Sequence, residues 1–249
     1  MADASPPSVV TSGFDRRSGR LLVLFALVGS AAAVIWREYI TWSLADFDPL
    51  LAACWVGMAA LAIYRVDVRR DARLALVALL GGALIEAWGT RAGLWAYFTG
   101  EQPPLFILPA WPAAALATER VTDWVARRSP ALSTAATRAA WLAAMVVFLA
   151  TLVPWMHPGW HHPLNAVAIG CVLVTLGTVR DPRADLVRLT AGCLVGLPLE
   201  YWGTSRGCWT YWSGGTPPLV AVLSHGFATV AFARGASLLA ALLSRKISL

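Results

Sequence analysis

One twelve-residue pattern occurs twice in this chain, and each copy places an acidic side chain at the end of an apolar run. The pattern is E-x-W-G-T-x-x-G-x-W-x-Y, from Glu86 to Tyr97 and again from Glu200 to Tyr211. The copies are 114 residues apart (200 − 86), and a Gly and then Pro-Pro-Leu follow each of them. A carboxylate in apolar surroundings is costly unless it is paired or hydrogen-bonded. Its recurrence with fixed aromatic neighbours therefore needs a physical reason.

The chain around this pattern is strongly apolar. Of its 249 residues, 58% are hydrophobic and only 14% are charged, and the mean hydropathy is +0.62. A soluble domain carries about 25% charged residues. The apolar runs approach the roughly 17–25 residues that span a bilayer. We therefore expect an all-α polytopic membrane helical bundle of about eight transmembrane helices. These runs are 21–36, 47–64, 74–90, 105–120, 139–156, 163–179, 189–204 and 218–243.

The basic residues lie on alternate connections. Seventeen of the 20 Lys and Arg residues lie in the N-terminal tail, or in the last part of or after the second, fourth, sixth and eighth runs. The positive-inside rule then places both termini in the cytoplasm, with the chain in a bacterial-type inner (plasma) membrane. This asymmetry also accounts for the pI of about 9.6, so we expect no nucleic-acid partner.

The duplication extends well beyond the motif. Matching residues recur at the same offset, without a gap, from Pro49 to Arg120 and from Pro163 to Arg234. The repeated unit has four runs, an even number, so both halves should have the same orientation about an axis along the membrane normal. We divide the chain into a cytoplasmic tail (1–20), a first transmembrane repeat (21–130) and a second (131–249).

Glu86 and Glu200 are the candidate catalytic residues. Glu86 lies about 18 Å into its run at 1.5 Å per residue, and Gly82 and Gly89 share its helical face. Small residues allow close helix packing, so the carboxyl group should point into the bundle. Intramembrane acids are functional candidates. The alternative is a structural carboxyl group that accepts hydrogen bonds from Trp, Thr or backbone groups of the following loop.

The aromatic residues of the two copies are candidate substrate-binding residues. Trp and Tyr also form belts at the bilayer interface, which is the alternative interpretation. If the rings line a cavity, they would face a carbocation or polyene, and cation–π attraction reaches about 2 kcal/mol in a desolvated site. The candidates are Trp88, Trp95, Tyr97, Trp202, Trp209 and Tyr211.

The four histidines fall into two groups. His225 occupies the position that Trp111 holds in the first half, and it is a candidate proton partner for Glu200. The other three have a spacing that would suit a Zn²⁺ ion held together with a Glu. Prolines on both sides favour an exposed loop instead, so we predict no metal and no cofactor. These three are His157, His161 and His162.

These residues resemble those of carotenoid-pathway membrane proteins, namely the heterodimeric or fused lycopene cyclases and the membrane carotenoid hydratases. In that family an acid precedes a G-x-W-x-Y-like loop, and tandem repeats of a few spans are common. The cyclases continue with Pro-x-Glu-Glu, whereas this chain has Leu108–Trp111 and Val222–His225 there, without the second acid. The matching residues are Glu86, Gly93, Trp95, Tyr97, Glu200, Gly207, Trp209 and Tyr211.

The resemblance implies an integral membrane enzyme that acts on a double bond of an isoprenoid or carotenoid-like lipid. An intramembrane Glu would be the general acid, and the outcome would be cyclisation, isomerisation or hydration without a redox cofactor. Two alternatives are a proton-coupled transporter of a small molecule or lipid and a structural membrane subunit. The expected partners are a hydrophobic lipid and the membrane, and a homo-oligomer is left open.

Overall fold

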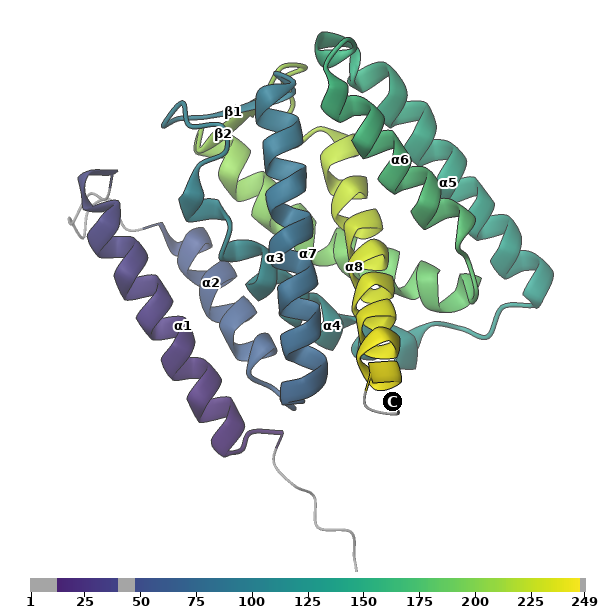
Figure 1. The fold of residues 1–249 in the computed structure, drawn as a ribbon, viewed down its shortest axis with the longest axis horizontal. Helices are drawn as coiled ribbons and strands as arrows, with labels where there is room; N and C mark the ends of the chain where they lie inside the picture. The colour runs from purple at the N-terminus through teal and green to yellow at the C-terminus, as the bar shows by residue number, and fades with distance from the viewer. Residues whose placement is uncertain (1–12, 40–47, 247–249) are drawn as a thin grey trace, which may run out of the picture.

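The structure is a computed structural model that describes residues 13–39 and 48–246, with side chains through 244. Within these residues the chain forms eight α-helices and one small sheet (Figure 1), which confirms the predicted all-α bundle. The helices are α1 (Arg16–Ile35), α2 (Pro49–Ala62), α3 (Val68–Arg91), α4 (Ala110–Arg128), α5 (Thr134–Trp155), α6 (Pro163–Gly177), α7 (Pro182–Ser205) and α8 (Leu219–Lys246). The strands are β1 (Trp95–Tyr97) and β2 (Trp209–Tyr211). Most of the predicted tail lies outside the described residues, as does most of the connection between the first two apolar runs, at residues 40–47.

Four of the described helices, α1, α3, α5 and α8, are long and apolar enough to cross a membrane. The apolar helices α2 and α6 have only 14 and 15 residues, or about 21–23 Å at 1.5 Å per residue. The hydrocarbon core is about 30 Å thick. The membrane character of the chain is thus supported, while the eight full crossings, the membrane type and the side of the termini stay predictions.

Several helices do not begin where the apolar runs predict. Asp67 and Asp181 cap α3 and α7 by accepting hydrogen bonds from backbone N–H groups of the first turn. These helices therefore begin six or seven residues before the expected runs at 74 and 189, because a charged first turn is stable behind an acidic cap. In contrast, α4 begins five residues late, since Leu105–Ile107 form a short 3₁₀ turn before Pro109.

The helices α3, α4, α7 and α8 form the centre of the bundle, where α4 packs against α7 and α3 against α8. The pair α1 and α2 lies on one side and the pair α5 and α6 on the other (Figure 1). The two strands pair antiparallel at one end, with Trp95 opposite Tyr211 and Tyr97 opposite Trp209. The sheet thus joins two segments that are 114 residues apart in sequence.

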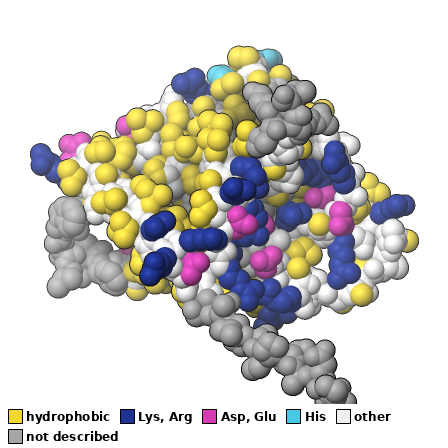
Figure 2. Space-filling model, turned by 60° about the horizontal axis from the view of Figure 1, so that its bottom comes forward, with side chains coloured by type: hydrophobic (Ala, Val, Ile, Leu, Met, Phe, Trp, Pro, Cys, Tyr) yellow, Lys and Arg dark blue, Asp and Glu magenta, His cyan; other side chains and the backbone are white. Residues whose placement is uncertain are grey.

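Ion pairs of two buried aspartates hold the opposite end of the bundle. Arg120 of α4 lies 2.5 Å from Asp71 of α3 and donates to the Tyr64 carbonyl after α2. In the second half, Arg234 of α8 lies 2.5 Å from Asp185 of α7. Both pairs recur at the same 114-residue offset. Figure 2 shows this end of the molecule, where many Lys and Arg side chains gather, as the distribution of basic residues predicts.

Candidate functional site: two buried carboxyl groups on one cavity

Glu86 is buried near the end of α3, with 4% of its surface exposed. Its Oε2 accepts hydrogen bonds from Trp95 Nε1 (3.1 Å) and from the Tyr97 hydroxyl (2.9 Å). Its Oε1 accepts from Trp111 Nε1 of α4 at 3.1 Å. An indole N–H only donates, so both carboxyl oxygens act as acceptors. The carboxyl group therefore points into the bundle, as predicted; two of its partners come from the segment that follows α3 and the third from α4.

Glu200 of α7 has the same surroundings with one difference. It is 6% exposed, and its Oε2 accepts from Trp209 Nε1 (3.1 Å) and the Tyr211 hydroxyl (2.9 Å). Its Oε1 lies 2.9 Å from Nε2 of His225 on α8. The predicted contact between His225 and Glu200 is thus present. Unlike the indole at the matching position, this imidazole can either donate or accept a proton.

The local sequence explains how one strand reaches back to the preceding carboxyl group. Gly93 has φ of +70°, a backbone conformation that glycine adopts without steric cost. The Leu94 N–H donates to the Gly89 carbonyl at 2.8 Å and the Gly93 N–H to the Thr90 carbonyl at 3.4 Å. This pattern is a Schellman cap, which ends α3 and reverses the chain. Alternate strand residues share a face, so Trp95 and Tyr97 both reach Glu86.

The W-G dipeptide of the motif creates room for the returning indole. A Cβ atom added at Gly89 would lie 1.7 Å from Cη2 of Trp95, and one at Gly203 would lie 1.9 Å from Cη2 of Trp209. Each indole thus lies directly on the helix that carries its Glu. The side chain of Trp88 packs against Trp95 edge to face at 5.9 Å. The fixed spacing of the motif is therefore the spacing of a folded loop.

The tyrosines stay neutral donors. Burial, and then the adjacent Glu86 carboxylate, raises the pKa of Tyr97 well above its usual value. Burial and the Glu200 carboxylate raise the pKa of Tyr211 in the same way. Both groups lie in the sheet, outside the helices that could span a membrane. Each hydroxyl therefore keeps its proton near neutral pH and donates a hydrogen bond to a carboxyl group.

Trp111 and His225 connect the two carboxyl groups. Their rings stack at 5.6 Å with an interplanar angle of 14°, and each ring contacts the Glu of its own half. Small residues make space for both rings, since a Cβ at Gly82 would lie 2.2 Å from Trp111 and one at Gly196 would lie 2.5 Å from His225. The site thus has two similar halves that differ in one functional group.

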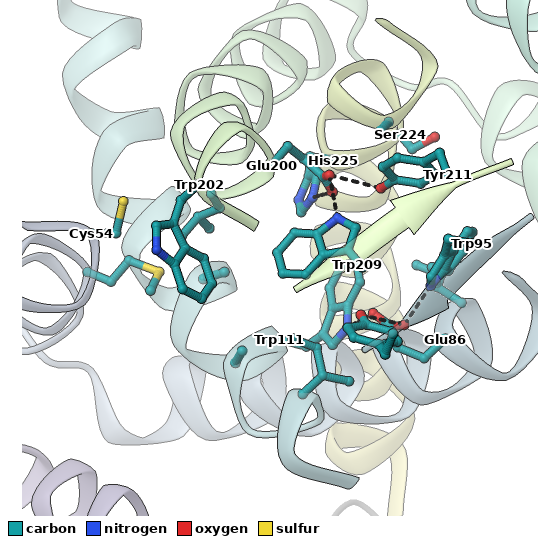
Figure 3. A pocket seen from close by; sticks show the side chains of 18 of the residues that line it. Cys54, Glu86, Trp95, Trp111, Glu200, Trp202, Trp209, Tyr211, Ser224 and His225 are labelled. Carbon is teal, nitrogen blue, oxygen red and sulfur yellow. Dashed lines mark hydrogen bonds and ion pairs between the residues drawn. The ribbon is translucent and has the colours of Figure 1, made fainter. Parts of the chain in front are cut away.

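A cavity of about 140 Å³ lies between the two carboxyl groups. Glu86, Glu200 and His225 line it together with all six aromatic candidates of the sequence. Figure 3 shows the carboxyl group of Glu200 among Trp209, Tyr211 and His225, with Trp111 and Glu86 on the neighbouring side. The structure therefore brings every predicted catalytic and substrate-binding residue to one cavity. The side chains of Trp88, Trp95 and Tyr97 are buried in the protein, so these three do not form an interfacial belt.

Two tryptophans of the site connect the halves to each other. Trp88 Nε1 donates to Asn165 Oδ1 of α6 at 2.6 Å. Trp202 Nε1, its counterpart, donates to Asp48 Oδ2 at the start of α2 at 3.0 Å. Arg206 donates to the same oxygen at 2.8 Å, and this bond, with the N–H groups of α2, lowers the pKa of Asp48 to about 2.

The remaining histidines lie away from the carboxyl groups. His157 belongs to a short 3₁₀ turn, and His162 caps α6 by accepting from the Leu164 N–H at 3.3 Å. Among residues 13–39 and 48–246 there is no group of three or more His, Cys, Asp or Glu side chains that could hold a metal. The capping role of His162 corresponds to that of Asp48 in the first half.

Three contacts of the site were not predicted from the sequence. Trp111 was noted only as the counterpart of His225, yet it is the third donor to Glu86. Asn165 was not singled out, because a single amide in an apolar run carries no spacing signal. The pairing of the two strands was also missed, since three residues are too few to show an alternating pattern.

Comparison with known proteins gives little further information. No protein-family model matches the chain, and no curated protein matches it. A solved structure of a cross-linked trimer of a protein called MvINS matches at 17% sequence identity with a TM-score of 0.42. That alignment covers 71% of this chain and 97% of the other.

Proposed function

We propose that the protein is an intramembrane acid–base enzyme that acts on a carbon–carbon double bond of an apolar isoprenoid lipid. One observation carries this proposal: the Glu200–His225 pair lines a cavity in which nine of the other twenty lining residues are aromatic. A carboxyl group beside an imidazole can hold and pass on a proton. The surrounding rings would stabilise positive charge on the substrate through their π-faces.

The two halves take different parts in this scheme. Glu200 transfers its proton to one carbon of the double bond, and the cation forms on the other carbon. Loss of a proton from a neighbouring carbon to Glu200 or His225 gives isomerisation. Attack of a second double bond of the chain on the cation closes a ring, and proton loss from the new cation completes cyclisation. Addition of water to the cation followed by proton loss gives hydration. Glu86, held by two indoles and a phenol, stays a carboxylate in this scheme, and its negative charge lies near the cation.

The proposal is tested by analysing the lipids of a lycopene-producing bacterium that expresses the protein. Liquid chromatography and mass spectrometry should show a product of unchanged mass, or of the mass of one added water. Glu200→Gln and His225→Phe should abolish the product, whereas Glu86→Gln should lower its amount. Equal product from wild type and Glu200→Gln, at equal protein levels, would refute the assignment.

A structural role is the second candidate, and a specific observation favours it. Each carboxyl group ties its helix to the strand that follows and to a neighbouring helix. On this interpretation Glu200→Gln lowers the stability of the purified protein and no product forms in any variant. The transporter alternative receives no comparable support from the contacts of the site.

A further inference from the structure

A second cavity lies beside the first, on its α6 side. It has a volume of about 440 Å³ and lies between α3, α5, α6 and α8, which is within the range of about 300–1,000 Å³ for ligand sites. No charged residue lines it, and its lining is apolar except for two hydroxyl groups. Ile85, Trp88 and Ser224 line both cavities, so the two spaces adjoin at these residues.

One part of the first cavity extends toward α2. The second cavity corresponds to that part in the other half of the repeat. Residues of the two linings match at the 114-residue offset, although the cavities have different volumes. We call the part near α2 the α2 wing and the second cavity the α6 wing. Matching lining residues are Cys54 and Ala168, Met58 and Val172, and Trp202 and Trp88.

The contacts of α6 explain why its wing is open. The helix is held near its start by the hydrogen bond from Trp88 to Asn165. It is held near its end by Arg234, which donates to the Thr175 carbonyl. Between these points Ala168 and Cys171 face the gap with small side chains. Val172 lines the cavity from the same stretch of α6, and space remains beside these three side chains.

Both wings reach the apolar outer surface of the bundle. Leu80, 63% exposed, lines the α6 wing on α3, and the α2 wing includes Trp55, 44% exposed. In a bilayer such surfaces face hydrocarbon rather than water. An occupant can therefore come from the membrane and needs no charged headgroup.

We propose that one linear, uncharged isoprenoid chain occupies both wings at once, with its middle beside Ile85 and Ser224 and a double bond near Glu200. The repeat explains this shape, because a duplicated half-site accepts a ligand whose two ends are chemically alike. Filling either wing should therefore displace the whole chain. The isoprenoid identity of the chain and the position of its double bond rest on the proposed function, whereas the occupation of both wings by one uncharged, apolar chain does not.

The test measures binding of squalene, a long linear isoprenoid hydrocarbon, to the purified protein in detergent. Ala168→Phe fills the α6 wing and Cys54→Phe fills the α2 wing. Val174→Phe and Val56→Phe are matched controls, since these side chains are 65% and 68% exposed on the same two helices and line neither cavity. Bound squalene per protein is quantified by mass spectrometry after removal of free lipid, and thermal unfolding checks that each variant is folded.

Each filling variant alone should lower squalene binding by about 5- to 150-fold, since overpacking a filled site costs about 1–3 kcal/mol. The controls should bind like wild type. Farnesene, with half the length, should still bind to either single variant. If each variant removes only half of the squalene and the double variant removes all of it, two separate lipids bind and the proposal is wrong. Binding that is equal in all variants also overturns it. Squalene binding without any product from any lipid would overturn the proposed function instead.

Discussion

The indole of Trp95 lies against the backbone of Gly89, and Gly89→Ala tests whether this contact organises the site. The added Cβ would lie 1.7 Å from Cη2 of the indole, far inside van der Waals contact. The ring has little freedom to move away, because Trp155 stacks on it at 6.3 Å and Glu86 accepts its N–H at 3.1 Å. The substitution must therefore displace the indole or bend α3.

The size of the effect follows from three terms. Overpacking costs about 1–3 kcal/mol, and losing a hydrogen bond to a charged group costs about 1.5–3 kcal/mol. Replacing Gly by Ala inside a helix returns about 1 kcal/mol. We expect a net loss of roughly 2–5 kcal/mol in the free energy of unfolding. At about 2–4 °C per kcal/mol for a chain of this size, the Tm should fall by about 4–20 °C.

The assay is thermal unfolding of the purified protein in one detergent, followed by tryptophan fluorescence. Gly57→Ala is the matched control, because nothing lies within 4 Å of a Cβ at that position of α2, and its Tm should stay constant or rise. Gly203→Ala should behave like Gly89→Ala, since its Cβ would lie 1.9 Å from Trp209. If Gly89→Ala unfolds at the temperature of the control, the indole does not lie on the helix and the account of the site is refuted.

Three further predictions concern contacts outside the carboxyl cluster. Asp71→Asn should lower the free energy of unfolding by about 3–5 kcal/mol, because its partner Arg120 stays buried without a charge to pair with. Asp185→Asn should lower it by less, because the side chain of its partner Arg234 is 21% exposed. The unfolding temperatures of the two variants test this order. Trp88→Phe leaves the Asn165 amide oxygen without its donor, so the free energy of unfolding should fall by about 1–3 kcal/mol. Squalene binding should fall as well. The Asp48 carboxylate, with its pKa lowered from 3.8 to about 2, contributes stability that is present above about pH 4 and lost as the pH falls through about 2. The difference in Tm between wild type and Asp48→Asn should shrink over that interval, and a constant difference would contradict the assignment.

The sequence predicted the eight helices because each of them overlaps one of the apolar runs, although α2 and α6 are shorter than the runs that predicted them. It also predicted that the acidic residue of each motif is buried, since glycines share its helical face. The helix starts were less accurate, because a capping Asp67 or Asp181 extends a helix through charged residues that no bilayer criterion includes. The start of α4 depends on a short 3₁₀ turn, which is not visible in the hydropathy of the chain.

The site residues could be named from the sequence, but their partners could not. The spacing of Trp95 and Tyr97 after Glu86 is local, so a repeated motif is enough to find them. Trp111 is 25 residues from Glu86 in sequence and Asn165 is 77 residues from Trp88. Such contacts depend on which helices become neighbours. The two wings likewise required the structure, because a cavity is defined by side chains of several helices.

The most direct test of the central claim is incorporation of deuterium from the solvent. Membranes that contain lycopene and the wild-type protein would be incubated in D₂O buffer, and the lipid products analysed by mass spectrometry. If Glu200 delivers an exchangeable proton to a double bond, the product gains one deuterium on carbon, and Glu200→Gln membranes yield no such product. A product that forms in D₂O without deuterium on carbon, or that forms equally with Glu200→Gln, would contradict the account.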